Sequence, residues 1–205
     1  MANVKITDLT AATTPLAGTE LFETVQSGVS RKVVATDIAN TATAVPYASL
    51  SGRAYLSAYS TVDQTGSVSA GTAVRIGTTD FSSGISIAND GGGNPTRITF
   101  AAAGTYMIAP SIQFKNADSS DHDVTVWFAK NGANISNSAT ILVVPKAGDG
   151  GVAFFQIVFY VQVTAGQYVE VYWLPEDINV TVDFTAAGAI APAIPSVIVC
   201  SERIA

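Results

Sequence analysis

The most reactive group of side chains in the sequence surrounds His122, the only histidine of the chain. It lies in the segment DSSDHDV with Asp118, Asp121 and Asp123, and such a mixture of carboxylate and imidazole groups can bind a metal ion. If the histidine did not coordinate, Ca²⁺ would be the expected ion, because Ca²⁺ prefers oxygen ligands. A solvated loop between two strands explains the same residues without an ion, and we predict no metal site.

Two further patterns could support catalysis, but neither has the spacing that the chemistry needs. Ser119 and Ser120 adjoin His122, yet neighbours along the chain rarely form a Ser-His-Asp triad, and no G-x-S-x-G nucleophile elbow is present. Glu176 and Asp177 resemble the paired carboxylates of glycoside hydrolysis, but adjacent residues in a turn normally point apart. We therefore predict a non-enzymatic protein without catalytic residues or a cofactor.

Composition favours a protein that works within an assembly. Of the 205 residues, 13% are charged and 48% are apolar; the charged share is about half of the usual value. The net charge is -6, and the basic residues are scattered apart from Arg31 and Lys32, which argues against nucleic-acid binding. No run approaches the ~20 apolar residues of a membrane span, and the start lacks the apolar run of a signal peptide. We expect neither nucleic acid nor a membrane as a partner.

Short strands separated by turn signals dominate the second half of the chain. The strand-like runs are AYLSAYS, TAVRI, GISIA, RITFA, TYMIAPSIQF, DVTVWFAK, ATILVV, VTVDF and PSVIVCSERI. Their spacing of about ten residues indicates an all-β fold, an antiparallel sandwich or barrel. Asn131 and Gly132 predict a type I′ turn, which needs positive φ at both positions. The single cysteine, Cys200, has no disulfide partner and is predicted to be a small buried residue.

Residues 153–174 are predicted to form a central hairpin of two long strands that turn at 164–166. Side chains alternate along a strand, so one face of this hairpin is wholly apolar and the other is aromatic and only partly polar. An aromatic face needs cover from water, which either another subunit or loops of the same chain can provide. The aromatic residues expected to be covered are Trp127, Tyr160, Tyr168 and Tyr172.

The chain divides into an N-terminal module at 1–45, a connector at 46–70 and a second domain at 71–205. Within the module, ELFETVQ and SRKVVAT predict a β-hairpin that turns at Gly28, and a short helix is expected over 38–44. So small a hairpin buries too little apolar surface to fold alone and needs a partner surface. The predicted docking residues are Leu21, Phe22, Val25, Arg31, Lys32 and Val33.

Four segments, GTYMI, VWFAKNGANI, TAGQYVEVYW and PSVIV, together resemble the jelly-roll domain shared by C1q and TNF-like proteins, above all the version at the C-terminal end of bacteriophage virion proteins. The opening, VKITDLTAATTPLAGTELFETVQSGVSRKVVATDIAN, is similar to the short N-terminal module of many phage tail-fibre and head-decoration proteins. The two resemblances cover nearly the whole chain apart from the connector.

This resemblance implies a C1q/TNF-like antiparallel jelly-roll sandwich with a small N-terminal β-hairpin anchor module, assembled as a homotrimer. The four aromatic residues would then lie at the trimer interface. The implied function is a capsid decoration or cement protein, made in the host cytoplasm and bound to the major capsid protein at the virion surface. The alternative is a short tail fibre or spike that is attached to a tail protein and recognises a host surface glycan.

Overall fold

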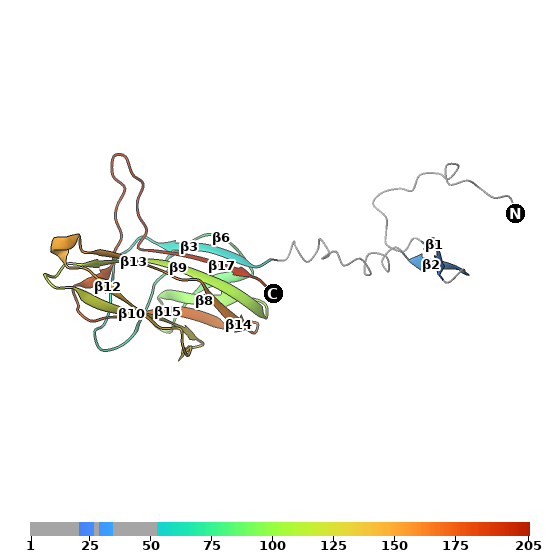
Figure 1. The fold of residues 1–205 in the computed structure, drawn as a ribbon, viewed down its shortest axis with the longest axis horizontal. Helices are drawn as coiled ribbons and strands as arrows, with labels where there is room; N and C mark the ends of the chain where they lie inside the picture. Colours follow the sequence, from blue (N-terminus) through green and yellow to red (C-terminus); the bar gives the residue numbers. More distant parts are fainter. Residues whose placement is uncertain (1–20, 27–28, 35–52) are drawn as a thin grey trace. The chain divides into compact units, whose positions relative to one another are not determined.

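The computed structural model describes residues 21–26, 29–34 and 53–205 of the chain (Figure 1). The chain separates into two compact units, Met1–Gly52 and Arg53–Ala205, which are described separately.

The first unit contains the predicted β-hairpin. Strands β1 (Leu21–Gln26) and β2 (Val29–Val34) pair in antiparallel register, with Phe22 opposite Val33 and Glu23 opposite Lys32. The hairpin prediction is thereby confirmed. The helix predicted over 38–44 lies outside the described residues.

The second unit is almost entirely β-structure, with one 3-10 turn, η2 (Ala147–Asp149), in its described residues. Its strands are β3 (Tyr55–Ser60), β4 (Gln64–Thr65), β5 (Thr72–Ala73), β6 (Thr78–Ser83), β7 (Ile85–Asn89), β8 (Pro95–Phe100), β9 (Gly104–Asn116), β10 (His122–Lys130), β11 (Ala133–Asn134), β12 (Thr140–Val144), β13 (Val152–Gln156), β14 (Phe159–Val163), β15 (Tyr168–Pro175), β16 (Val180–Val182) and β17 (Val197–Arg203). In the part of the chain that the structure describes, no helix is long and apolar enough to cross a membrane.

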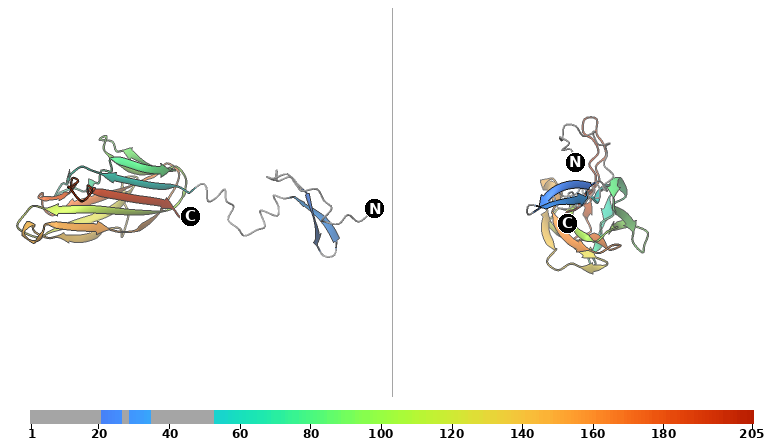
Figure 2. Two further views of the ribbon diagram at one scale, coloured as in Figure 1. Left: turned by 90° about the horizontal axis from the view of Figure 1, so that it is seen from above. Right: turned by 90° about the vertical axis from the view of Figure 1, so that its right-hand side faces the viewer.

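These strands form two antiparallel sheets that pack face to face (Figures 1 and 2). The first sheet has the order β4-β16-β9-β17-β3-β6, with β13 and β14 also paired to β9. The second sheet has the order β11-β10-β15-β8-β7, with β12 beside β10 and β5 beside β15. Two stacked antiparallel sheets of this kind bury the inner side chains of both.

The order of the principal strands is that of a jelly roll. Numbered along the chain, these strands are β3, β8, β9, β10, β12, the interrupted pair β13 and β14 counted as one, β15 and β17. The first sheet then reads 1-8-3-6 and the second reads 2-7-4-5, which is the double Greek-key pattern. Successive strands change sheets at every step except from β10 to β12, which pair with each other in the second sheet. The predicted all-β jelly roll is confirmed.

Alternating side chains explain why these segments form strands with one buried face. Along β9, the inward residues Tyr106, Ile108, Ile112 and Phe114 are fully buried, while the intervening residues are half-buried or exposed. Across the sandwich, the Phe114 ring lies 5.5 Å from the Trp173 ring of β15, measured between centroids. A period of two therefore places the apolar face of each sheet against the other.

The predicted central hairpin is wrong, although its strands exist. β13 and β14 pair with β9 in the first sheet, whereas β15 pairs with β10, β8 and β5 in the second. The turn at 164–166 therefore carries the chain from one sheet to the other. Alternation shows which face of each strand is buried, but two successive strands can satisfy it by pairing side by side or by facing each other across the core.

The jelly roll also begins earlier than predicted. The compact unit starts at Arg53, and β3 pairs along its whole length with β17, burying Leu56 and Ala58. Most of the segment at 53–70, assigned to the connector, is thus part of the domain. The run AYLSAYS is strand-like in the sequence, but only its pairing with β17 shows that it belongs to the jelly roll.

The predicted turn at Asn131 and Gly132 is confirmed. The two residues have φ values of 50° and 80°, the positive pair that a type I′ turn requires. The hairpin joins β10 to β11, with Lys130 opposite Ala133.

Burial predicts very different effects for the same substitution at two isoleucines. Ile112→Ala in β9 should lower the free energy of unfolding by about 2–5 kcal/mol, because Ile112 is 0% exposed and its loss leaves a cavity. Ile141→Ala in β12 should cost less than about 1 kcal/mol, because Ile141 is 64% exposed. Urea denaturation of both variants would measure this, and equal losses would contradict the core described above.

Candidate functional site

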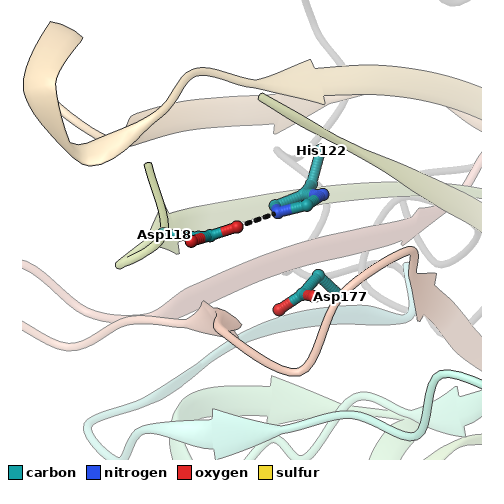
Figure 3. Close-up of side chains that lie close together, drawn as sticks. All are labelled: Asp118, His122 and Asp177. Carbon is teal, nitrogen blue, oxygen red and sulfur yellow. Dashed lines mark hydrogen bonds and ion pairs between the residues drawn. The ribbon is translucent and has the colours of Figure 1, made fainter. Parts of the chain in front are cut away.

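Three side chains that could bind a metal ion meet at one end of the jelly roll (Figure 3). Asp118 lies between β9 and β10, His122 begins β10, and Asp177 lies between β15 and β16. One ligand atom from each residue lies within 4.8 Å of the other two. Both connections run between the two sheets at this point, so the fold brings together residues that are far apart in the sequence.

The Asp118 side of this cluster is held by a buried asparagine. Asn116 ends β9, and its side-chain amide donates hydrogen bonds to the carbonyl oxygens of Ser120 (2.8 Å) and Val144 (3.3 Å). Its side-chain oxygen accepts a hydrogen bond from the backbone N–H of Asp118 at 2.8 Å. Because these hydrogen bonds are buried, breaking one would leave a polar group without a partner and away from water. The loop therefore has a defined shape before any ligand binds.

The Asp177 side is held by hydrogen bonds to the start of β10. The Glu176 N–H donates to the carbonyl of Asp123 at 2.9 Å, and the Asp123 N–H donates to Oε2 of Glu176 at 3.0 Å. Asp177 is fixed in turn because its Oδ1 accepts hydrogen bonds from the backbone and side-chain amides of Asn179, both at 2.8 Å.

His122 stands between carboxylates on both sides of its ring. Its Nε2 lies 2.8 Å from Oδ2 of Asp118, and its Nδ1 lies 3.7 Å from Oε2 of Glu176. The hydrogen bond to Asp118 raises the pKa of His122 above its ordinary value of 6.5, and the negative charges of Asp177, Asp118 and Glu176 raise it further. The same hydrogen bond lowers the pKa of Asp118 below 3.8.

The structure combines parts of two sequence patterns that were considered separately. Asp118 and His122 come from the acidic loop, and Asp177 comes from the carboxylate pair. Asp121 accepts a hydrogen bond from the Lys146 N–H at 2.8 Å and is not part of the cluster. Asp177 lies near His122 because the connection from β15 to β16 comes close to the connection from β9 to β10. The spacing of residues along the chain does not reveal this proximity.

A second feature is the outer surface of the first sheet, here called the apolar sheet face. In one row across it, Tyr160 of β14 lies opposite Met107, Met107 opposite Glu202, and Glu202 opposite Tyr55. The large apolar residues exposed on the strands of this face are Tyr55, Phe81, Val152, Phe154, Tyr160 and Ile198, with exposed fractions of 41–61%. Cys200 also lies there and is exposed, so the prediction that it is buried is wrong.

The four predicted interface aromatics are divided between the two sheets. Trp127 and Tyr172 belong to the second sheet and stack with ring centroids 5.6 Å apart. Gly71 lies against both rings, so close that an added Cβ would sit 2.5 Å from Trp127. The Tyr168 ring is covered by the Arg97 guanidinium at 4.3 Å. These three side chains are half-buried by their own chain, whereas Tyr160, in the first sheet, is 57% exposed.

The predicted docking residues all lie in the β1–β2 hairpin. They are Leu21, Phe22 and Val25 of β1, and Arg31, Lys32 and Val33 of β2. The antiparallel register places Thr24 opposite Arg31 and Val25 opposite Ser30. Docking through them remains a prediction.

The strand order thus defines an antiparallel jelly roll with a side-chain cluster at one end and an apolar outer face. No family model and no curated protein matches the chain. Among solved structures, it is similar to murine APRIL, a jelly-roll protein of the TNF family, in crystals at pH 8.5, 5.0 and 8.0. The identities are 10%, 9% and 10% and the TM-scores 0.47, 0.46 and 0.46, each covering 74% of this chain and 99% of the APRIL chain.

The raised pKa of His122 predicts a pH-dependent contribution to stability. The benefit of its protonated form is fully present below the unfolded value of 6.5 and is lost as pH rises through the higher folded pKa. The stability difference between the wild type and His122→Gln should therefore be largest near pH 5 and shrink above pH 6.5. Urea denaturation in the presence of EDTA would measure it.

The chain has no other histidine, so a change in this difference around neutral pH reports on His122 alone. A difference that stays constant from weakly acidic to weakly alkaline pH would show that the interaction with Asp118 does not favour the imidazolium.

Proposed function

We propose that this chain is a structural protein of a bacteriophage particle, with a jelly roll that assembles as a trimer and an N-terminal unit that attaches it to the capsid. The proposal is supported by the resemblance of both parts of the sequence to phage virion proteins. The separation into two compact units agrees with this division of labour. In such a protein, one unit contacts the particle and the other assembles on its surface.

The observation that carries the proposal is the apolar sheet face. Six large apolar side chains are about half exposed on one sheet, in a protein with few charges. Large apolar side chains exposed together on one face are typical of an interaction site in soluble proteins. Each Å² of apolar area that it buries contributes about 25 cal/mol before ordering costs are subtracted. We assign the trimer contact to this face, retaining Tyr160 from the predicted interface and adding Tyr55, Phe81, Val152, Phe154 and Ile198.

Trimer formation would explain how a hairpin as small as β1–β2 can attach a protein to a capsid. Each strand has six residues, so a single copy offers a limited contact area. Three linked copies bind with a high effective concentration once the first has docked, and weak contacts then add up to a stable attachment. The partner surface, on the major capsid protein, must provide three equivalent positions. The attached chain would thereby reinforce the shell.

A second candidate function is recognition of a host surface glycan by a short tail fibre or spike. The observation that favours it is a pocket of about 300 Å³ beside β4, β5 and β8. Its polar lining includes Arg75, Asp90 and Asn94, whose donors and acceptors suit sugar hydroxyl groups.

Replacement of one exposed aromatic residue should separate the proposed trimer. Wild-type protein at micromolar concentration should sediment as a trimer of the 21.1 kDa chain. Tyr160→Lys should shift it towards the monomer, because a desolvated lysine at the contact costs about 2 kcal/mol or more per copy. Analytical ultracentrifugation would measure the distribution.

Ile141→Lys provides a matched control, since Ile141 is 64% exposed but lies on β12 of the second sheet. It should leave the trimer intact. A wild-type chain that sediments as a monomer would contradict the proposal, and equal dissociation of both variants would place the contact elsewhere.

A further inference from the structure

The cluster at the end of the jelly roll has the composition of a transition-metal site. Two carboxylates and one imidazole converge from two connections, with their ligand atoms within 4.8 Å of one another (Figure 3). Ligand atoms about 2.0–2.2 Å from a tetrahedral ion are about 3.3–3.6 Å apart. Nε2 of His122 and Oδ2 of Asp118, which are 2.8 Å apart, would have to move slightly apart to share such an ion, whereas the ligand oxygen of Asp177 lies within 4.8 Å of both.

A carboxylate behind the histidine provides an independent indication. Metal-binding histidines almost always donate the N–H of the second ring nitrogen to a carboxylate or carbonyl oxygen, which orients the ring and raises its basicity. Here, Oε2 of Glu176 lies 3.7 Å from Nδ1 of His122, an ion-pair distance that is too long for a hydrogen bond, on the far side of the ring from Asp118. Glu176 is itself held by the N–H of Asp123. The tautomer that protonates Nδ1 leaves the lone pair of Nε2 directed at Asp118.

The negative charge of the cluster also favours a bound metal ion. Asp118, Glu176 and Asp177 surround one imidazole, which supplies at most a single positive charge. Within residues 53–205, no lysine or arginine forms an ion pair with any of these three carboxylates; Lys146 pairs with Asp149, and Lys115 with Asp183. A divalent ion offsets this negative charge better than one proton does.

We propose that Asp118, His122 and Asp177 bind a single divalent transition-metal ion, with Zn²⁺ as its representative. The imidazole distinguishes this ion from Ca²⁺, which takes six to eight oxygen ligands, because one of the three ligand atoms is a ring nitrogen of His122. Glu176 acts as a positioning residue for the histidine. The inference is independent of the proposed function, and it replaces the expectation that the loop is simply solvated.

The bound ion would join two connections between the sheets. Asp118 and His122 belong to the connection from β9 to β10, and Asp177 belongs to the connection from β15 to β16. A ligand that binds the folded chain more tightly than the unfolded chain stabilises the fold. Zn²⁺ should therefore raise the melting temperature, and this effect should disappear when a ligand is removed.

The test is isothermal titration calorimetry of the full chain with ZnCl₂, after removal of any histidine tag and of metal by EDTA and dialysis. His122 and Cys200 are the only histidine and cysteine of the chain, so the background from other sites is low. The wild type should bind one Zn²⁺ per chain. His122→Gln and Asp177→Asn should each bind at least about tenfold more weakly, and Glu176→Gln about tenfold more weakly.

Asp149→Asn is the matched control, because Asp149 is an exposed acid in η2, whose Ala147 N–H donates to the carbonyl of Asp118. It should leave Zn²⁺ affinity unchanged, and circular dichroism in EDTA should show that every variant folds. Asp177→Asn retains the oxygen that accepts the Asn179 hydrogen bonds. Absence of wild-type binding, or equal affinity in the wild type, His122→Gln and Asp177→Asn, would overturn the proposal.

Discussion

The burial of alternating side chains between the two sheets is the constraint on which the rest of the structure depends, and β9 is its central element. Its thirteen residues pair with β17 and β16 on one side and with β13 and β14 on the other. The inner face of β9 packs against β15 across the core, where Phe114 meets Trp173. Because this strand must bury one face, its other face is turned outward, and its end at Asn116 determines where the connection to the second sheet begins.

The two functional features follow from this arrangement and are spatially separate. The apolar sheet face is the outer surface of the sheet that contains β9, and its aromatic residues are about half exposed. The second sheet differs, because Gly71 and Arg97 cover its aromatic residues. The Asp118, His122 and Asp177 cluster lies where connections leave the strands, so a change there can alter stability without altering the apolar sheet face.

Much of the fold, but little of the site, could be predicted from the sequence. The all-β class, the β1–β2 hairpin and the turn at Asn131 and Gly132 depend on local patterns, which the sequence displays directly. The jelly roll is expected from the resemblance to C1q and TNF-like proteins. The placement of β14 and β15 in different sheets could not be predicted, because alternation does not distinguish a hairpin from a crossing between sheets. Asp177 and His122 are fifty-five positions apart, and only the long-range topology brings them together. The aromatic residues of the predicted hairpin face are divided between the two sheets for the same reason.

The central claim is that this protein is a trimeric component distributed over a phage capsid. Its most direct test is to count copies of the chain in purified particles by quantitative mass spectrometry against the major capsid protein. A capsid decoration or cement protein occupies positions throughout the lattice, so the account predicts hundreds of copies per particle, in proportion to the capsid sites with threefold symmetry. Absence of the chain from purified particles, or its presence in only a few tens of copies, would contradict this account.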